Sequence, residues 1–352
     1  MNITAVYFVF PGNLETPTGG YHYDRRLIHE LRQLGLGVET IALSDQFPFP
    51  DDQALEDARE ALAAVPDGAV VIIDGLAFGT LEHLAEAEAQ RLRIIALCHH
   101  PLALESGLDQ AQQQRFQASE QRALHAACAV LVTSEHTRQS LIDQFAMPPE
   151  KVVVALPGTD PAPFSPCIGS PLRLLTVASL TRRKAHDVLI DALAPLTDLP
   201  WQARFVGGKG FDPDWSEALQ QQVNRLQLQD RIQLVGAVDD LESEFQKADL
   251  FVLPSRYEGY GMVFAEALAA GLPVIAARAG AVPDVVPESA GLLVPPDDTA
   301  ALTEALRSLL TRDDLRRQLQ AGARNAAAHL PTWAETARRV ALLAEDTLRS
   351  PS

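Results

Sequence analysis

Two glutamates in the segment 254–276 surround the point where an apolar helix is predicted to begin. Glu266 lies within that helix among apolar neighbours, where a carboxylate is costly unless a partner donates hydrogen bonds to it. The helix is predicted to begin near Gly261, and the backbone amides of Gly261, Met262 and Val263 at its start suit an anion. A polar group, an anion and a second polar group follow one another in this order in a nucleotide sugar, which favours such a ligand.

Glu258 stands eight residues before Glu266, in the loop that precedes the helix. At 1.5 Å per residue, Glu266 is about 7 Å along the axis from the helix start. The amides could therefore hold a diphosphate while the two glutamates reach hydroxylated groups on either side. The alternative is a favourable charge near the helix N-terminus at Glu258 and an internal partner for Glu266. Both interpretations stay open on these two residues alone.

A basic segment, Arg182, Arg183 and Lys184, precedes another predicted helix that begins near Ala185. Cations at this end of a helix oppose the positive end of its dipole, a placement that suits a bound, multiply charged anion. A solvated basic turn is the alternative. The glycine loop 206–210, which contains Gly207, also ends a strand but is weak support, since glycine turns after strands are common.

In the first half, polar and glycine residues follow three predicted strands. Gly19 and Gly20 lie at a strand-to-helix turn, where they allow a bound group to approach the backbone, although a tight turn without a ligand fits equally well. Asp74 ends the strand 69–74, where it faces the cleft or caps the next segment. Two consecutive histidines, His99 and His100, follow the strand 93–98. Their side chains are expected to point into a cleft.

The elements that position these residues alternate between short apolar strands and helices, which indicates parallel sheets covered on both faces. The strands of the first half are predicted at 2–10, 38–43, 69–74, 93–98, 129–134 and 151–156. After a proline-rich linker at 157–171, the strands of the second half are predicted at 172–178, 201–207, 231–236, 249–255 and 272–277. The fold class is therefore α/β with two doubly wound, Rossmann-like domains, and ligands of such sheets bind at the carboxyl ends of the strands. The chemistry is expected between the domains.

The composition of the 352 residues narrows the choice of partners. A net charge of −17 argues against nucleic acid and anionic lipid surfaces, and residues 1–160 carry 10 basic against 22 acidic residues. Three scattered cysteines and no CxxC pair indicate neither a disulfide framework nor a zinc site. No apolar stretch has the length of a membrane span, and the beginning of the chain does not resemble a signal peptide. A cytoplasmic protein is expected.

Metal and cofactor motifs are not found in the sequence. It contains no HExxH, no P-loop, no GxSxG and no GxGxxG. The single DxD, at 212–214, lies in a proline-containing loop and is interpreted as a turn. No metal and no cofactor are therefore expected.

In their order along the chain, the motifs resemble the retaining glycosyltransferases of family 4, which have the GT-B architecture. The resemblance covers nearly the whole length. It rests on a glycine pair in the first loop, a histidine after the fourth strand, PGTD at 157–160, the Arg183-Lys184 pair, LVG at 234–236, and above all E-x7-E from Glu258 to Glu266.

This resemblance implies a role for each motif. Glu266 would hold the ribose hydroxyls, Glu258 the sugar, and Arg183 and Lys184 the diphosphate. The histidine that contacts the donor sugar would be His99, with His100 as the second choice, and Gly20 would face the phosphate or the acceptor. Backbone groups lining the sugar and diphosphate would come from Gly259, Tyr260, Gly261, Met262 and Val263.

The resemblance also implies domain roles and a reaction. Residues 1–160 would bind the acceptor, residues 161–331 would bind the nucleotide sugar, and the helix 332–352 could pack back on the first domain. The expected partners are a nucleoside-diphosphate sugar and a small-molecule, glycan or lipid-linked acceptor. The sugar would be transferred without a metal and with retention, a donor phosphate oxygen taking the acceptor's proton.

The sequence departs from the family pattern at two places. Many members have Gly-Arg where this chain has Ala178-Ser179, so that Arg182 or Arg183 would have to supply the missing phosphate contact. The family usually has Lys-Gly where this chain has Lys184-Ala185. The alanine side chain makes the start of the helix more crowded.

Three other functions compete with sugar transfer. A sugar-nucleotide epimerase or phosphorylase of the same architecture fits less well with E-x7-E. A two-domain binding protein would be expected to carry a signal peptide. A nicotinamide oxidoreductase is disfavoured because GxGxxG is missing.

Overall fold

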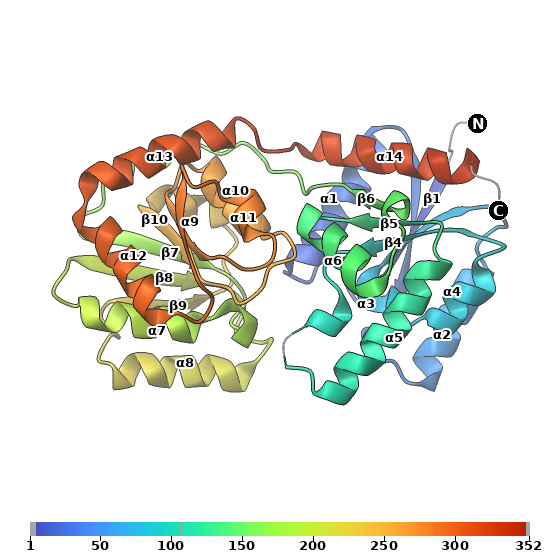
Figure 1. Cartoon of the computed structure of the whole chain (residues 1–352), viewed down its shortest axis with the longest axis horizontal. Helices are drawn as coiled ribbons and strands as arrows, with labels where there is room; N and C mark the ends of the chain where they lie inside the picture. The colour runs from blue at the N-terminus through green and yellow to red at the C-terminus, as the bar shows by residue number, and fades with distance from the viewer. Residues whose placement is uncertain (1–4, 106, 350–352) are drawn as a thin grey trace. The chain divides into compact units, whose positions relative to one another are not determined.

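The computed structural model describes residues 5–105 and 107–349 and divides the chain into two compact units. Unit 1 comprises Met1–Gly158 with Pro331–Ser352, and unit 2 comprises Thr159–Leu330. Each unit contains one six-stranded parallel sheet with helices on both faces (Figure 1). Residues 155–171 contain no helix or strand.

Unit 1 has the strand order β2-β1-β3-β4-β5-β6. Its strands are β1 (Ala5–Pro11), β2 (Gly37–Leu43), β3 (Val70–Asp74), β4 (Arg93–Cys98), β5 (Ala129–Val132) and β6 (Val152–Val154). Its helices are α1 (Gly19–Gln33), α2 (Asp52–Ala63), α3 (Gly75–Phe78), α4 (Glu82–Glu88), α5 (Gln110–Ala126), α6 (Glu135–Phe145) and α14 (Trp333–Arg349), with 3-10 turns at Leu102–Leu104 and Pro149–Lys151. Residues 2–4 of the first predicted strand and 350–352 of the last predicted helix lie outside the described residues.

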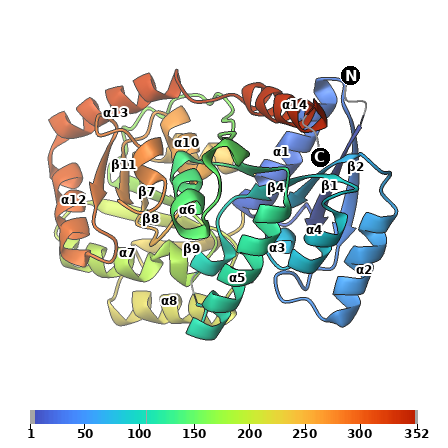
Figure 2. The ribbon, with the colours of Figure 1, turned by 45° about the vertical axis from the view of Figure 1, so that its right-hand side comes forward.

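Helix α14 joins unit 1 although it comes last in the chain. It lies beside α1 in both views (Figures 1 and 2) and also contacts β3, β4 and β5. The rings of Tyr23 and Trp333 meet edge to face, with centroids 5.7 Å apart, and the guanidinium of Arg26 lies over the Trp333 ring. Gly158 fits against Trp333, because a Cβ at this glycine would lie 2.2 Å from the Trp333 backbone nitrogen.

Unit 2 has the strand order β12-β11-β10-β7-β8-β9. Its strands are β7 (Leu172–Val177), β8 (Trp201–Val206), β9 (Ile232–Gly236), β10 (Leu250–Leu253), β11 (Val274–Ala277) and β12 (Gly291–Val294). Its helices are α7 (His186–Leu193), α8 (Pro213–Arg225), α9 (Leu241–Lys247), α10 (Met262–Ala269), α11 (Val282–Val285), α12 (Thr299–Thr311) and α13 (Asp313–Ala327), with 3-10 turns at Arg182–Lys184 and Ala194–Leu196.

Buried apolar residues form a core on each face of the unit 2 sheet. Residues of α7, α8 and α12 pack on one face, and residues of α10 and α11 pack on the other. The predicted parallel α/β architecture is confirmed. The edge strand β12 was missed, because its four residues, which begin with Gly291 and are followed by a proline, are too few for a clear pattern.

Among the described residues, no helix combines the length and the apolar character that a membrane crossing needs.

Candidate functional site

The two sheets each have a switch point, where the strand order reverses and ligands of such sheets bind. In unit 2 it lies between β7 and β10, and the loops that follow these strands carry Arg183, Lys184 and Glu258. In unit 1 it lies between β1 and β3. Gly20 and His99 follow β1 and β4, and Asp74 is the last residue of β3. Most predicted site residues therefore lie at the carboxyl ends of their own sheet's strands.

The structure brings Arg183, Lys184 and Glu258 together in what we call the Glu258 cluster. Lys184 Nζ lies 2.6 Å from Glu258 Oε1, and Arg183 Nη1 lies 3.3 Å from Glu258 Oε2. The Glu258 side chain is only 6% exposed and that of Lys184 15%. Burial alone would raise the pKa of Glu258, but the charges of Lys184 and Arg183 outweigh it and lower this pKa. Two cations therefore contact the same buried carboxylate.

Sequence reasoning missed two residues that hold this cluster in place. The backbone N–H of Arg256 donates to the Arg183 carbonyl at 2.8 Å, and the Arg256 guanidinium pairs with Asp187 at 3.0 Å. Gly280 has a φ of +56°, and a Cβ there would lie 2.1 Å from the Glu258 carbonyl oxygen. A lone arginine and a lone glycine give no spacing signal, so tertiary contacts alone identify them.

Glu266 lies in the second turn of α10 and is half-buried. Among the contacts of the described residues, no hydrogen bond or ion pair reaches its carboxylate. Burial, with a smaller contribution from the negative charge of Asp160, raises the pKa of Glu266 to about 7. The internal partner that would have explained this residue without a ligand is therefore not found.

The predicted backbone-lining residues surround the start of α10. Gly261 is the residue before the helix and has a φ of +86°, which favours glycine, while Met262 and Val263 form the first turn. Tyr260 is buried, which raises the pKa of its hydroxyl to about 12. Gly259 connects Glu258 to this turn. The first amides of a helix lack partners within it, so this position suits an anion.

Three other predicted features of unit 2 have structural explanations. The Arg182 side chain is 63% exposed and stacks 4.3 Å from the Trp215 ring centroid. Gly207 packs so closely that a Cβ would lie 1.8 Å from the Ala178 carbonyl oxygen. The DxD segment opens α8 and is more than a turn, because Asp212 Oδ1 accepts the Trp215 N–H at 3.0 Å and caps the helix.

In unit 1, Asp24, Asp74 and His99 form what we call the His99 cluster. His99 Nε2 lies 3.1 Å from Asp24 Oδ1 and 3.4 Å from Asp74 Oδ2. Asp74 also caps α3, since its Oδ1 accepts the Leu76 N–H at 2.8 Å. The ligand atoms of these three residues lie within 4.8 Å of one another, a spacing compatible with a metal ion and equally accounted for by the ion pairs. His100 is not part of the cluster and pairs with Glu105 at 3.3 Å.

Helix α1 begins at Gly19, earlier than the sequence predicted, because the Thr18 side chain caps it by accepting the Tyr21 N–H. Gly19 and Gly20 therefore form the first helical turn. A Cβ at Gly20 would lie 3.4 Å from His99 Cδ2, so this glycine packs against the histidine ring.

Asp24 was overlooked as a functional residue. It lies on the same face of α1 as Leu27, Ile28 and Leu31, at positions i+3, i+4 and i+7, and it is fully buried. A carboxylate on an apolar helix face is the signal that singled out Glu266, and it could have identified Asp24 as well.

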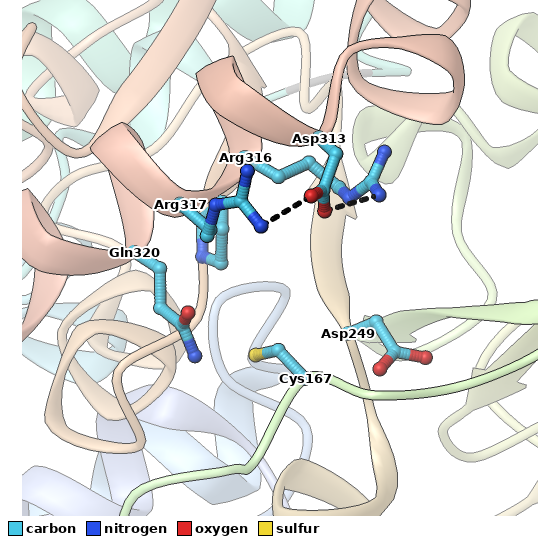
Figure 3. Close-up of a pocket in the computed structure, with 7 residues that line it drawn as sticks. Cys167, Asp249, Asp313, Arg316, Arg317 and Gln320 are labelled. Atoms are coloured by element: carbon cyan, nitrogen blue, oxygen red, sulfur yellow. Dashed lines mark hydrogen bonds and ion pairs between the residues drawn. The ribbon is translucent and has the colours of Figure 1, made fainter.

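A small pocket in unit 2 lies away from the predicted site residues. Cys167, Asp249, Arg316, Arg317 and Gln320 are among its lining residues (Figure 3). Asp249 and Pro273 precede β10 and β11, so the pocket lies at the amino ends of these strands. Its charges are already paired, since Asp313 binds both Arg316 and Arg317. It is therefore not a candidate for the predicted chemistry.

Comparison with known proteins gives two family matches. Residues 54–163 match the model described as "Glycosyltransferase Family 4", and residues 171–312 match "Glycosyl transferases group 1". A D-inositol 3-phosphate glycosyltransferase of Corynebacterium kroppenstedtii is 30% identical over 270 residues, which cover 70% of this chain and 59% of the relative. The chain thus spans less than two thirds of the length of the first curated relatives it matches.

Solved structures resemble the whole chain. Sucrose-phosphate synthase from Thermosynechococcus elongatus has a TM-score of 0.82 at 22% identity, with 98% of this chain and 100% of that chain covered. HepE of Anabaena, in complex with UDP-glucose, has a TM-score of 0.78 at 19% identity, with 97% and 99% covered. These identities establish the fold. The chain therefore has the GT-B fold, and its residues 54–163 and 171–312 are similar to glycosyltransferase domains of Family 4 and of group 1.

Proposed function

We propose that this chain is a retaining glycosyltransferase that moves a sugar from a nucleoside-diphosphate sugar, of the UDP or GDP type, to a hydroxyl of an acceptor. The acceptor is a small molecule, a glycan or a lipid-linked saccharide. The reaction proceeds without a metal ion or another cofactor.

The observation that carries the proposal is the half-buried Glu266 carboxylate, which no described residue contacts by a hydrogen bond or ion pair, together with the two cations of the Glu258 cluster. A nucleotide sugar satisfies both at once. Its ribose hydroxyls donate hydrogen bonds to Glu266, and its diphosphate accepts from Lys184, Arg183 and the first amides of α10. A mononucleotide or an uncharged sugar would satisfy these groups only in part.

Glu258 fits a positioning role better than that of a nucleophile. Its two oxygens are engaged by Lys184 and Arg183, and its lowered pKa makes it a poor base. The carboxylate therefore fixes the two cations where the departing diphosphate gathers charge. Preorganised cations of this kind stabilise a leaving group without reorganising during the reaction.

A same-face reaction is consistent with this arrangement. The bond between the sugar's anomeric carbon and the phosphate oxygen breaks, and a bond from that carbon to the acceptor oxygen forms on the same face. The acceptor proton moves to a donor phosphate oxygen, and the nucleoside diphosphate leaves. No protein nucleophile is needed, so the cations and the positioning groups carry the rate enhancement.

The relatives support the choice of donors to test. HepE of Anabaena has been solved with UDP-glucose, and the curated relatives are named as D-inositol 3-phosphate glycosyltransferases. The Asp212 cap of α8 supports the proposal of a metal-independent reaction, because the single DxD of the sequence is occupied in a structural role.

The test is donor hydrolysis by the full chain. UDP-, GDP- and ADP-sugars are incubated without acceptor, in the presence of EDTA, and the released nucleoside diphosphate is measured. We expect slow release from one donor, and proton NMR of the freshly released sugar should show the anomer that the donor carried. Inversion would overturn the retaining assignment, and release that depends on added metal would overturn metal independence.

Two variants link the activity to the site. Glu266→Gln and Lys184→Ala should each lower nucleoside diphosphate release at least tenfold. Glu242→Gln and Lys247→Ala, both at exposed positions of α9, are the matched controls and should keep full activity. If no donor is hydrolysed and no nucleoside diphosphate raises the melting temperature, the proposed function is wrong.

A further inference from the structure

The His99 ring is held through one nitrogen only. Both carboxylate contacts, from Asp24 and Asp74, are made to Nε2. Among the contacts of the described residues, none involves Nδ1 of His99, and the side chain is 23% exposed. Nδ1 is therefore the nitrogen that remains for a ligand.

The two carboxylates are much more deeply buried than the histidine they contact. Asp24 is fully buried on α1, and its Oδ2 has no hydrogen-bond partner among the described residues. Asp74 is 4% exposed at the end of β3. Buried carboxylates are costly unless a cation compensates them, and His99 is the cation that both of them contact. The charge balance of the cluster therefore favours a protonated ring.

Packing fixes the orientation of this ring. The Tyr23 ring meets it edge to face, with centroids 5.2 Å apart and an interplanar angle of 81°. Gly20 also lies against the ring, since a Cβ there would make an ordinary contact with His99 Cδ2 at 3.4 Å. The Thr133 hydroxyl donates to the His99 carbonyl at 3.4 Å. A flipped ring would direct a carbon toward the two carboxylates and lose both ion pairs.

We propose that Asp24 and Asp74 are positioning residues that hold His99 as an imidazolium through Nε2, so that Nδ1–H is the donor this cluster offers to a substrate oxygen. The inference rests on the proposed function and deepens it. The substrate group is a hydroxyl or phosphate oxygen, because a cationic N–H donor binds such acceptors most strongly. A neutral histidine in the same place would offer a weaker donor or a lone pair.

The electrostatics of the cluster agree with its geometry. Burial would lower the pKa of His99, but hydrogen bonds and charges from Asp24 and Asp74 outweigh it and raise this pKa to about 10. Burial and the charge of Asp74 raise the pKa of Asp24 to about 7, although His99 opposes this. Two tyrosines face the cluster, Tyr23 and Tyr21, and burial raises the pKa of both hydroxyls, that of Tyr21 to about 12. The neighbouring tyrosines therefore remain neutral where His99 is charged.

The decisive experiment is a pH titration of the histidine side chains by NMR, on the full chain labelled with ¹⁵N-histidine and without any donor. His99→Gln identifies the His99 signals by their disappearance. In the wild type we expect His99 to stay an imidazolium beyond pH 8. In Asp24→Asn and, separately, in Asp74→Asn, its midpoint should fall by about one pH unit or more. Glu120→Gln, a buried carboxylate of unit 1 outside the cluster, is the matched control and should leave the midpoint unchanged.

Opposite outcomes overturn the proposal. A wild-type midpoint near 6.5, or a midpoint that neither aspartate variant moves, means that the carboxylates do not set the charge of His99. Selective broadening of the His99 signals by Mn²⁺ at micromolar concentration means that the cluster is a metal site instead. Because no donor is present, these results do not depend on whether the chain transfers sugar.

A kinetic arm tests the positioning role. If donor hydrolysis is observed, Asp24→Asn should lose activity at lower pH than the wild type does, with the KM for the donor changed less than kcat. Asp24→Glu restores the charge and should recover part of the alkaline activity. Equal losses at all pH values would indicate a purely structural role for Asp24 and would contradict the proposal.

Discussion

The clusters of the two units have opposite charge arrangements. In unit 1 a single cation, His99, lies between two carboxylates, and in unit 2 a single carboxylate, Glu258, lies between two cations. Both clusters lie at the carboxyl ends of parallel strands, at the switch point of their sheet. The same backbone architecture thus supports either charge arrangement, and the side chains at the strand ends determine which one is present.

The two arrangements respond differently to the loss of their central group. Carboxylates can take up protons, so the His99 cluster can neutralise itself when its cation is removed. Arginine and lysine keep their charge at neutral pH, and a buried carboxylate among them stays ionised. The Glu258 cluster therefore offers a fixed positive charge to an anion, whereas the His99 cluster is sensitive to pH.

The largest effect is expected when Lys184 is replaced by methionine. This change leaves Glu258 paired with Arg183 and removes the charge of Lys184. Nucleoside diphosphate release should fall by about 10²–10³-fold, and the free energy of unfolding should fall by about 3 kcal/mol, measured by urea titration. The double variant Lys184→Met, Glu258→Gln should recover most of the stability and none of the activity. Recovery of both would mean that the cations do not act on the donor.

The glycines that support the two clusters should differ in their tolerance of a methyl group. Gly280→Ala forces a Cβ against the Glu258 carbonyl at a positive φ and should lower the free energy of unfolding by about 2–3 kcal/mol. Gly20→Ala makes only an ordinary contact with His99 and should unfold at nearly the same urea concentration as the wild type. Equal stability of the two variants would contradict the close packing around Glu258.

Removal of the unit 1 cation should cost stability in a manner that depends on pH. The pKa of His99 is raised to about 10 from an ordinary 6.5, so its stabilising contribution is complete below pH 6.5 and is lost as pH rises through 10. Glutamine carries no charge at either pH, so His99→Gln removes most stability at the pH where the ion pairs of the wild type contribute fully. We expect a loss of about 2 kcal/mol at pH 5.5 and about 1 kcal/mol at pH 8.5. A loss that is larger at the alkaline pH would contradict the ion pairs.

The smallest effect is expected when Arg182 is replaced. Unlike Arg183 and Lys184, it stacks on Trp215 at the surface. Arg182→Gln should change donor hydrolysis by less than about threefold and the free energy of unfolding by less than about 0.5 kcal/mol. Arg183→Gln is its matched partner and should lower hydrolysis at least tenfold. If the two variants behave alike, the contact with Glu258 does not distinguish these arginines.

Much of the fold could be predicted because alternation between apolar strands and helices is a local property. The strand Arg93–Cys98 was placed at its observed ends, and α10 begins within one residue of its predicted start. Helix α1 was predicted to begin too late, since the contribution of the Thr18 cap was not weighed against the two glycines. Strand β12 was not predicted because its four residues are too few to show a clear pattern.

The site was predicted less completely than the fold. Glu258, Glu266, Arg183 and Lys184 were found because charges beside a glycine loop or inside an apolar helix are conspicuous. Asp24 was not, because its helix also carries exposed charged residues and only the packed face distinguishes a buried carboxylate from a solvated one.

The sequence by itself determined the alternation of strands and helices and the candidate residues at the ends of the strands. Only the tertiary structure decided that Glu258 lies between Lys184 and Arg183, that no described residue pairs with the Glu266 carboxylate, and that His99 lies against Asp24. The physical reason is the range of the interactions. Periodicity and capping act within a few residues, whereas Glu258 is 74 residues from Lys184 and His99 is 75 residues from Asp24. Contacts at such separations follow from sheet topology, which brings the ends of distant strands to one edge.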